Sequence, residues 1–356
     1  MNSPDTAIDW QSKMDAWSYA YPQPIVSGLV KDQPEDFQVV EEMDVVPTGQ
    51  GEHIWLLIRK TKQNTEQLAK QLARFTNVAY RDVAYSGLKD FFAITQQWFS
   101  IYLPKGDTLD WSLFEMPGVE ILEITRHSRK LKRGTHRANH FAIEIKNLSG
   151  DLDSLNTKLT HIEEYGVPNY YGPQRFGRGG NNVAQAIDML QNSTRIKNRN
   201  LRSILLSSAR SWLFNTIVSA RINDQSWQKL WPGEPANLDG TRSIFQSGNE
   251  DHSERLASSD IHPTAPLWGE VDEQTLEAYK ALHGWELQLM NESSKDLVQG
   301  LARARLSYQR RPIRMRVKQM DWRLDARTLK LSFALQKGQF ATSVLREIVK
   351  EAPIKS

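Results

Sequence analysis

The chain has 356 residues, with 45 Lys or Arg against 42 Asp or Glu, and no cysteine. The lack of cysteine excludes disulfides, thiolate nucleophiles and Cys-ligated metals. No apolar run approaches the length of a membrane span, and Met1–Trp10 carries two aspartates without a basic residue, unlike a signal or transit peptide. We therefore expect a cytoplasmic protein that makes no use of a membrane, and its length favours two domains.

The first 150 residues predict a mixed α and β structure. A helix is expected at Asn64–Asn77, because Asn64 suits an N-cap and apolar residues at Leu68, Leu72 and Phe75 share one face. Apolar runs and alternating patterns predict strands at Phe37–Glu41, His53–Arg59, Val83–Gly87, Trp98–Leu103, Val119–Thr125 and Phe141–Lys146.

The middle of the chain is mainly helical in its pattern. Helices are predicted at Leu152–Glu164, Ala184–Leu190, Ser208–Ile222 and Glu273–His283. Between them, Gly166–Asn182 is rich in Gly, Pro, Asn and Tyr, and Pro232–Pro266 is expected to be irregular.

The last segment returns to β then α. Leu329–Leu335 alternates as a strand, Gly338 breaks it, and Thr342 or Ser343 can cap a helix that reaches Lys350. The order predicts an α+β protein in which a helical domain is inserted into a mixed-sheet domain, and the C-terminal strand completes the first sheet.

Basic residues gather in three separated runs, which favours a surface that binds a polyanion over a merely solvated face. The densest run, Arg126–Arg137, is expected to be a long exposed connection between two strands. It includes Arg126, Arg129, Lys130, Lys132 and Arg133. The others are Arg303–Lys318 and the group Arg195, Lys197, Arg199 and Arg202.

Several familiar chemistries do not fit the sequence. Gly177–Gly180 lacks the Lys-Ser/Thr ending of a phosphate loop. His136 and His140 are four residues apart, but His140 borders a predicted strand and no acidic third ligand lies near, so no metal site is expected. There is also no Gly-x-Ser-x-Gly elbow.

The loop Ser86–Asp90 is the better candidate for catalysis. It places Lys89 and Asp90 side by side after a glycine, at the end of a predicted strand. A sheet holds such a loop rigidly, and a carboxylate beside a cation stays ionised, as a nucleophile or general base requires. An Asp in this position is more often a turn or cap residue, so the loop alone does not decide the function.

Five stretches of the sequence resemble the TruD family of transfer RNA pseudouridine synthases, in the family's order and over nearly the whole chain. The string from Pro168 to Gly177, Pro-Asn-Tyr-Tyr-Gly-Pro-Gln-Arg-Phe-Gly, is the most specific of them. The stretches are Lys31–Phe37, Ser86–Asp90 with Thr95 and Trp98, Gly166–Gly177, Ser208–Arg210 with Phe214 and Asn215, and Gly338–Glu347.

The resemblance implies a pseudouridine-synthase catalytic domain with a largely helical TRUD insertion domain. The catalytic domain would be discontinuous, formed by residues 1–165 and 313–356, and the insertion would comprise residues 166–312. It also implies an isomerase that converts uridine 13, in the D arm of tRNA, to pseudouridine. That reaction oxidises nothing and consumes no water, so the resemblance implies no cofactor, nucleotide or metal. We expect a monomer whose partner is tRNA.

Roles for single residues also come from the resemblance. Asp90 matches the family's essential aspartate, which attacks C1′ of the ribose or takes its 2′ proton, and the sequence does not choose between these routes. Lys31 matches a lysine that keeps that carboxylate charged. Asn139 and Phe141 match residues lining the site, and Phe340 matches an aromatic that stacks on the flipped-out base. Arg126, Arg129, Lys130, Lys132, Arg133 and Arg175 are the predicted RNA-binding residues.

The sequence departs from the family directly after the catalytic aspartate. Many members have a basic residue and a histidine there, whereas this chain has Phe91 and Phe92. Two other functions would require different residues. A non-catalytic RNA-binding protein or chaperone would keep the basic runs but would not need Asp90. A hydrolytic glycosidase needs a second positioned carboxylate, which the sequence does not offer.

Overall fold

The computed structural model describes residues 9–104, 109–192, 194–248 and 250–351. Contacts divide the chain into two compact units. The sheet unit comprises residues 24–159, 317–341 and 348–356, and the helical unit comprises residues 1–23, 160–316 and 342–347.

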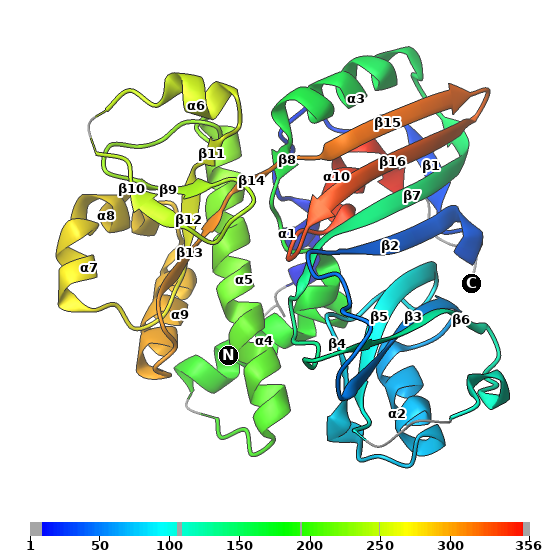
Figure 1. The fold of residues 1–356 in the computed structure, drawn as a ribbon. Coiled ribbons are helices and arrows are strands. Elements are labelled where there is room, and N and C mark those ends of the chain that lie inside the picture. Colours follow the sequence, from blue (N-terminus) through cyan, green and yellow to red (C-terminus); the bar gives the residue numbers. More distant parts are fainter. Residues whose placement is uncertain (1–8, 105–108, 193, 249, 352–356) are drawn as a thin grey trace, which may run out of the picture. The chain divides into compact units, whose positions relative to one another are not determined.

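The sheet unit is built on one mixed sheet, which the described residues form from ten strands. Its main path runs β15-β16-β7-β2-β5-β3-β6, while β1 pairs with β7 and β17, and β4 pairs with β5 (Figure 1). All pairs are antiparallel except β2–β5 and β1–β17. The strands are β1 (Ser27–Val30), β2 (Phe37–Met43), β3 (His53–Thr61), β4 (Val83–Tyr85), β5 (Ile94–Tyr102), β6 (Val119–His127), β7 (His136–Ser149), β15 (Lys318–Asp325), β16 (Thr328–Gln336) and β17 (Lys350–Glu351).

Helix α2 (Thr65–Phe75) packs its apolar stripe against this sheet (Figure 1). The predicted cap is confirmed, because the Asn64 side chain accepts hydrogen bonds from the backbone N–H groups of Glu66 and Gln67. Leu68 and Leu72 are fully buried, in one core cluster with residues of β3, β4 and β5. Helix α2 and the strands it packs against together support the loop that follows β4.

The strand register aligns residues across four strands. Phe141 of β7 lies opposite Val39 of β2, Val39 opposite Thr95 of β5, and Thr95 opposite Lys60 of β3. Because paired residues point to the same side of a sheet, these four side chains share one face. Two residues further along both strands, Asn139 lies opposite Glu41, so these side chains are on that same face.

Two strands begin at least four residues before the predicted position. β5 begins at Ile94 rather than Trp98, and β7 runs over His136–Ser149 rather than Phe141–Lys146. Each strand pairs with neighbouring strands along its length. Backbone hydrogen bonds to these neighbours therefore extend it beyond the residues whose apolar and polar side chains alternate. The basic connection consequently shortens to Ser128–Thr135, and Arg126 and Arg137 lie within strands.

The helical unit surrounds the long helix α5 (Arg199–Asn223), which begins nine residues before the predicted Ser208 under the Asn198 cap. Its other helices are α1 (Trp10–Asp15), α4 (Asn181–Gln191), α6 (Ser253–Ala257), α7 (Glu273–Ala278), α8 (Lys280–Gln288) and α9 (Glu292–Arg303). Helix α3 (Asp153–Tyr165) spans the boundary between the units, and α10 (Ala341–Ile348) lies mostly in the helical unit. Its short strands are β8 (Val167–Pro168), β9 (Pro235–Leu238), β10 (Ile244–Gln246), β11 (Ile261–His262), β12 (Thr264–Leu267), β13 (Gln309–Pro312) and β14 (Arg314–Met315).

Two predictions for this unit were wrong. The segment Pro232–Pro266 is not irregular, because it contributes β9, β10 and β11 to a small sheet of strands too short to leave a periodic pattern. The predicted helix Glu273–His283 is two helices, α7 and α8, which meet at Tyr279. Among the described residues, no helix is both long and apolar enough to cross a bilayer.

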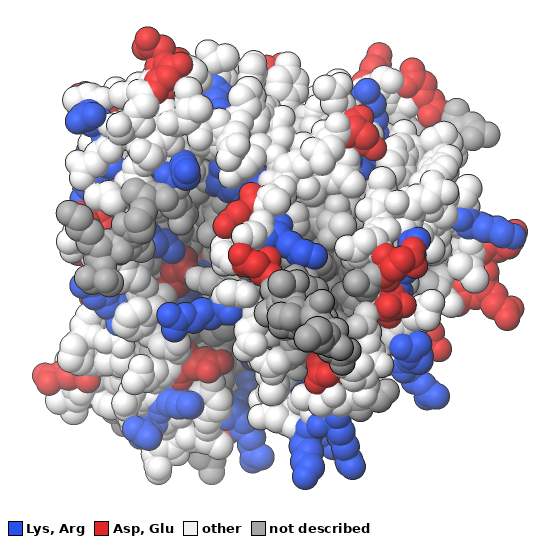
Figure 2. Space-filling view, turned by 180° about the vertical axis from the view of Figure 1, so that it is seen from behind, with Lys and Arg blue, Asp and Glu red and all other residues white. Residues whose placement is uncertain are grey.

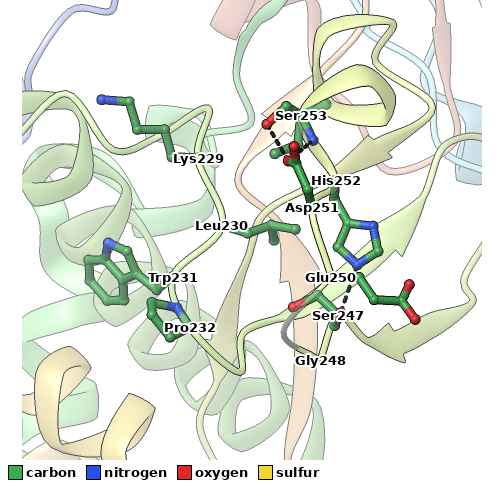
Figure 3. Close-up of a pocket in the computed structure, with 11 residues that line it drawn as sticks. Lys229, Leu230, Trp231, Pro232, Ser247, Gly248, Glu250, Asp251, His252 and Ser253 are labelled. Carbon is green, nitrogen blue, oxygen red and sulfur yellow. Dashed lines mark hydrogen bonds between the residues drawn. The ribbon is translucent and has the colours of Figure 1, made fainter.

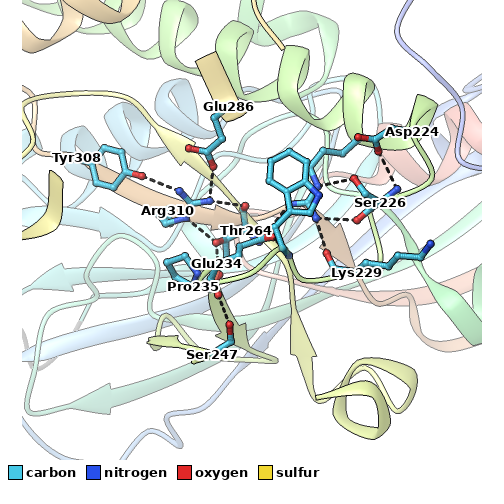
Figure 4. A network of polar contacts seen from close by, with 12 residues as sticks. Asp224, Ser226, Lys229, Glu234, Pro235, Ser247, Thr264, Glu286, Tyr308 and Arg310 are labelled. Atoms are coloured by element: carbon cyan, nitrogen blue, oxygen red, sulfur yellow. Dashed lines mark hydrogen bonds and ion pairs between the residues drawn. The ribbon is translucent and has the colours of Figure 1, made fainter. Parts of the chain in front are cut away.

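A buried polar network ties the strands and helices of the helical unit together (Figure 4). The Arg310 guanidinium donates to the Glu286 carboxylate at 2.6 Å and to the carbonyl of Thr264 at 2.7 Å. The Arg221 guanidinium pairs with both Glu234 carboxylate oxygens at 2.8 Å. The inclusion of Arg310 in an RNA-binding surface is therefore wrong, since its side chain is only 2% exposed and is neutralised internally.

The predicted α+β class with a large mixed sheet is confirmed. The strand expected near Leu329–Leu335 is β16, and it joins the first sheet beside β7. The described residues 9–23, and residues 342–347, group with the helical unit.

Candidate active site

The backbone of the loop Ser86–Asp90 is fixed at several points. The carbonyl of Ser86 accepts from the N–H of Gly134 at 2.7 Å, and the carbonyl of Gly87 accepts from the Gln97 amide at 3.1 Å. The N–H of Lys89 donates to the Thr65 hydroxyl at 3.2 Å. Contacts from α2, β5 and the basic connection thus hold a loop that has no regular structure of its own.

Asp90 and Lys31 form an ion pair in which Lys31 Nζ lies 3.1 Å from Asp90 Oδ2. Both groups remain accessible, since their side chains are 36% and 21% exposed. Lys31 has a φ of 60°, in the left-handed region that non-glycine residues seldom adopt. Such strain persists only where surrounding structure imposes it, and it gathers at functional sites. The pair joins residues 59 positions apart.

Aromatic contacts connect this pair to Phe141. The Lys31 ammonium lies 3.9 Å from the centroid of the Phe37 ring, a cation–π contact. Phe37 in turn meets Phe141 edge-on at 6.0 Å, and Phe141 stacks on Phe333 at 5.2 Å. Phe37 and Phe333 are buried, whereas Phe141 is half-buried. Phe141 is therefore a fixed ring at the margin of the core.

Asn139 presents an unused acceptor on the same face of the sheet. Its side-chain oxygen is buried and has no hydrogen-bond partner among the residues that the structure describes. Such a group costs free energy unless a ligand or a water satisfies it. The site therefore holds an acceptor that suits an incoming N–H donor.

A buried cluster that the sequence analysis missed lies next to Asp90. Lys89 Nζ lies 2.7 Å from Glu41 Oε1, and these side chains are 6% and 0% exposed. The other Glu41 oxygen accepts from the N–H of Trp98 at 3.0 Å. Lys89 thus points into the protein, and the opposite charge beneath it anchors the residue beside Asp90.

His136 and Ser86 extend this cluster. The backbone N–H of His136 donates to Ser86 Oγ at 2.8 Å, so the Ser86 hydroxyl can donate its proton to His136 Nδ1, 2.6 Å away. Burial lowers the pKa of the His136 imidazole, and the nearby Lys89 charge adds to the effect. A lowered pKa favours the neutral ring, whose Nδ1 can accept this proton.

Lys60 is the second residue that the sequence analysis missed. Its side chain is completely buried, and its ammonium donates to the backbone carbonyls of Gln63 at 2.7 Å and Asp90 at 3.2 Å. Burial lowers its pKa to about 8, against the opposing effect of the Asp90 charge. A lysine in a strand is ordinarily read as exposed, so no sequence signal marked it.

The sequence is similar to known proteins over nearly its whole length. The sequence profile of tRNA pseudouridine synthase D (TruD) matches residues 13–187 and 180–348. The protein of that name from Pseudomonas putida (strain W619) is 40% identical over 93% of this chain and 94% of its own length. The one from Aeromonas salmonicida (strain A449) is 42% identical over 95% of both chains. This chain belongs to the TruD family.

The fold agrees with that membership. A solved structure described as TruD from Methanosarcina mazei matches with a TM-score of 0.67 and 17% identity, covering 95% of this chain and 97% of that one. The family prediction made from the five sequence stretches is confirmed by the sequence matches. Because that solved structure is distant in sequence, it supports the fold rather than any role of a single residue.

The remaining predicted residues of this TruD-family chain are more scattered. Phe340 is half-buried directly before α10, and its place beside the base stays a prediction. Arg175 lies in the helical unit, where it donates to the Ser207 hydroxyl at 3.0 Å. Arg126 is half-buried in β6 and donates to backbone carbonyls of Gly51 and Leu103, so it is not part of the exposed connection.

The connection itself keeps four exposed basic residues. One of them, Lys130, donates to the backbone carbonyl of Arg81. Leu131 is buried against Trp55 and Trp98 and fixes the segment to the sheet. Acidic and basic side chains are interspersed on the face shown in Figure 2. The exposed members are Arg129, Lys130, Lys132 and Arg133.

A hollow of about 400 Å³ in the helical unit contains none of the predicted site residues (Figure 3). Its lining includes Glu250, Asp251 and His252, whose ring lies 2.7 Å from the carbonyl of Ser247. In Figure 3 the Lys229 ammonium points away from these acids. Two carboxylates make the hollow a poor place for an RNA phosphate. Within the described residues, no group of three or more His, Asp or Glu is arranged to hold a metal ion.

Proposed function

We propose that this protein isomerises uridine 13 in the D arm of tRNA to pseudouridine, with Asp90 as the catalytic carboxylate. The observation that carries the proposal is the accessible Asp90–Lys31 pair, held on a rigidly anchored loop in a chain of the TruD family. The family name supplies the reaction and the kind of substrate. The position in tRNA rests on the resemblance described above.

The reaction rearranges bonds without an external reactant. The C1′–N1 bond breaks, the uracil turns while it is held, and a C1′–C5 bond forms; the C5 proton leaves and N1 takes up a proton. Asp90 either attacks C1′ or takes the 2′ proton, and Lys31 keeps the carboxylate ionised by pairing with it before the reaction. No step calls for a metal or a nucleotide cofactor.

The other site residues would hold the base. Uracil offers an N–H donor at N3, which suits the buried, unused oxygen of Asn139. Phe141 would contribute the fixed edge of the site, and Phe340 would stack on the flipped-out ring. Stacking of this kind contributes roughly 1–3 kcal/mol per base.

The proposal extends to the organisation of the chain. Residues 1–165 and 313–356 would form the catalytic domain, and residues 166–312 the TRUD insertion that recognises the shape of tRNA. Arg129, Lys130, Lys132, Arg133 and Arg175 would contact phosphates. A monomer in the cytoplasm, where tRNA is modified, suits this role.

The test follows tritium released from C5 of uracil in a tRNA transcript. Wild type should release label, whereas Asp90→Asn should bind the transcript and release none. Asp321→Asn is the matched control, because Asp321 is an exposed carboxylate on β15 of the same sheet. A transcript with cytidine at position 13 should release no label from that site.

Release by Asp90→Asn at the wild-type rate would disprove the catalytic assignment. If wild type releases no label from any tRNA but still binds it, the chain is an RNA-binding protein that has kept the fold.

A further inference from the structure

Two large apolar side chains flank the catalytic residue and face solvent. Leu88 is 65% exposed and Phe91 is 55% exposed, whereas the side chain of Lys89 between them is 6% exposed. Single exposed apolar residues are common on protein surfaces. Here two occur within four residues, on the loop that carries Asp90, where a substrate must approach.

The exposure of Phe91 does not come from a loose loop. The Asp90 carbonyl is bound by Lys60, and the Phe91 carbonyl accepts from the N–H of Ala93 at 3.0 Å. The next ring, Phe92, is half-buried and lies 5.1 Å from the Lys62 ammonium. The backbone carbonyls of Asp90 and Phe91 are therefore both hydrogen-bonded, while the Phe91 side chain remains exposed.

Phe91 is accessible to a ligand, because 55% of the residue is exposed. Within the described part of the chain, no other aromatic ring and no cation packs on it. A rigid, exposed phenyl ring is a suitable platform for a flat apolar surface. The exposed Lys62 nearby adds a positive charge.

The chemistry of the proposed function selects the occupant. An enzyme that extrudes a uridine from a folded RNA arm also removes a stacking partner from the bases on either side of it. An aromatic ring restores such a contact with any base, because every base has a π-face. The positive charge of Lys62 suits the adjoining phosphate.

We propose that Phe91, together with the exposed Leu88 of the same loop, is a stacking surface for a nucleobase adjacent to the target uridine. The proposal rests on the proposed function and deepens it. It assigns to the apolar side chain after the catalytic aspartate a role in holding the opened RNA strand. In family members with a polar pair at these positions, other contacts would perform that role.

The test is a thermodynamic cycle between the protein and the RNA. Wild type and Phe91→Ala are compared in single turnover on normal tRNA and on tRNA in which one base beside the target, on either side, is replaced by an abasic nucleotide. On normal tRNA at subsaturating enzyme, Phe91→Ala should lower the single-turnover rate constant by roughly five-fold or more, as the loss of one base–aromatic contact predicts. On one of the two abasic substrates the two enzymes should react alike.

Two further variants complete the design. Phe91→Tyr keeps a ring and should restore most of the activity, whereas Leu113→Ala removes a different exposed apolar side chain of the sheet unit, 70% exposed, and should change nothing. Because Phe91 is exposed, its substitution should leave the thermal midpoint unchanged.

The outcomes separate this inference from the proposed function. If wild type releases tritium but Phe91→Ala is equally active, the stacking surface is wrong and the function stands. The same holds if the loss from Phe91→Ala is unchanged on both abasic substrates. If wild type is inactive on every tRNA, both proposals fail.

Discussion

The two lysines that contact Asp90 differ in the group their ammonium binds. Lys31 meets the carboxylate and is partly exposed, whereas Lys60 is buried and meets the carbonyl of the same residue. A charge buried without a carboxylate beside it lowers stability, so Lys60 holds the Asp90 backbone at some cost to the fold.

Lys60 predicts a dependence of stability on pH. Burial lowers its pKa from 10.5 to about 8, so between these values the unfolded chain holds a proton that the folded chain has released. The free energy of unfolding should therefore rise with pH across this window. Relative to Lys60→Met, wild type should gain about 2 kcal/mol between about pH 7.5 and about pH 10.

Urea unfolding of wild type and Lys60→Met at the two pH values measures this difference. Groups that titrate in the same way in both proteins make no contribution to it. A difference in stability that stays constant with pH would mean that Lys60 keeps an ordinary pKa.

At the scale of elements, the loop that carries Asp90 depends on a strand that is distant in sequence. β2 supplies Glu41, which lies beneath the loop and pairs with Lys89. Removing one partner of a buried ion pair leaves an unpaired charge in the core. This lowers the free energy of unfolding far more than breaking an exposed pair does. The loop geometry and the sheet are thus stabilised by the same contact.

Glu41→Gln should lower the free energy of unfolding by about 3 kcal/mol, because it leaves the Lys89 ammonium buried and unpaired. The double variant Glu41→Gln/Lys89→Met should recover part of that loss. Glu120→Gln is the matched control, since the Arg59–Glu120 pair of the same sheet is 44% and 60% exposed. It should cost less than about 1 kcal/mol.

These values come from chemical denaturation at neutral pH. Equal losses for Glu41→Gln and Glu120→Gln would show that the buried pair does not anchor the loop.

At the scale of the whole molecule, the three basic runs differ in how exposed their side chains are. The connection after β6 and the run at Arg195, Lys197, Arg199 and Arg202 stay exposed. In the run Arg303–Lys318, Arg310 and Arg314 are buried and bind groups within the helical unit. Count and spacing of charges thus overestimated the surface available to RNA.

The exposed connection predicts how tRNA affinity depends on salt. Each lost phosphate contact should reduce the slope of log K against log salt by about 0.7 to 0.9, so replacing Arg129, Lys132 and Arg133 by Ala should reduce it by about 2. Lys280→Ala with Lys295→Ala is the control, because these lysines pair with Glu277 and Glu292. Filter binding over a salt series measures the slope, and an unchanged slope in the triple variant would remove the connection from the interface.

The sequence by itself determined the family, the α+β class, the Asn64 cap and the loop that carries Asp90. Such features depend on residues a few positions apart, or on strings specific enough to be recognised without a fold. Only the tertiary structure decided that Glu41, Lys60 and His136 meet around this loop, and that Arg310 is buried. The Glu41–Lys89 contact spans 48 positions and the Lys60–Asp90 contact spans 30. Strand register sets both contacts, and register is fixed by pairing across the sheet rather than by any local pattern.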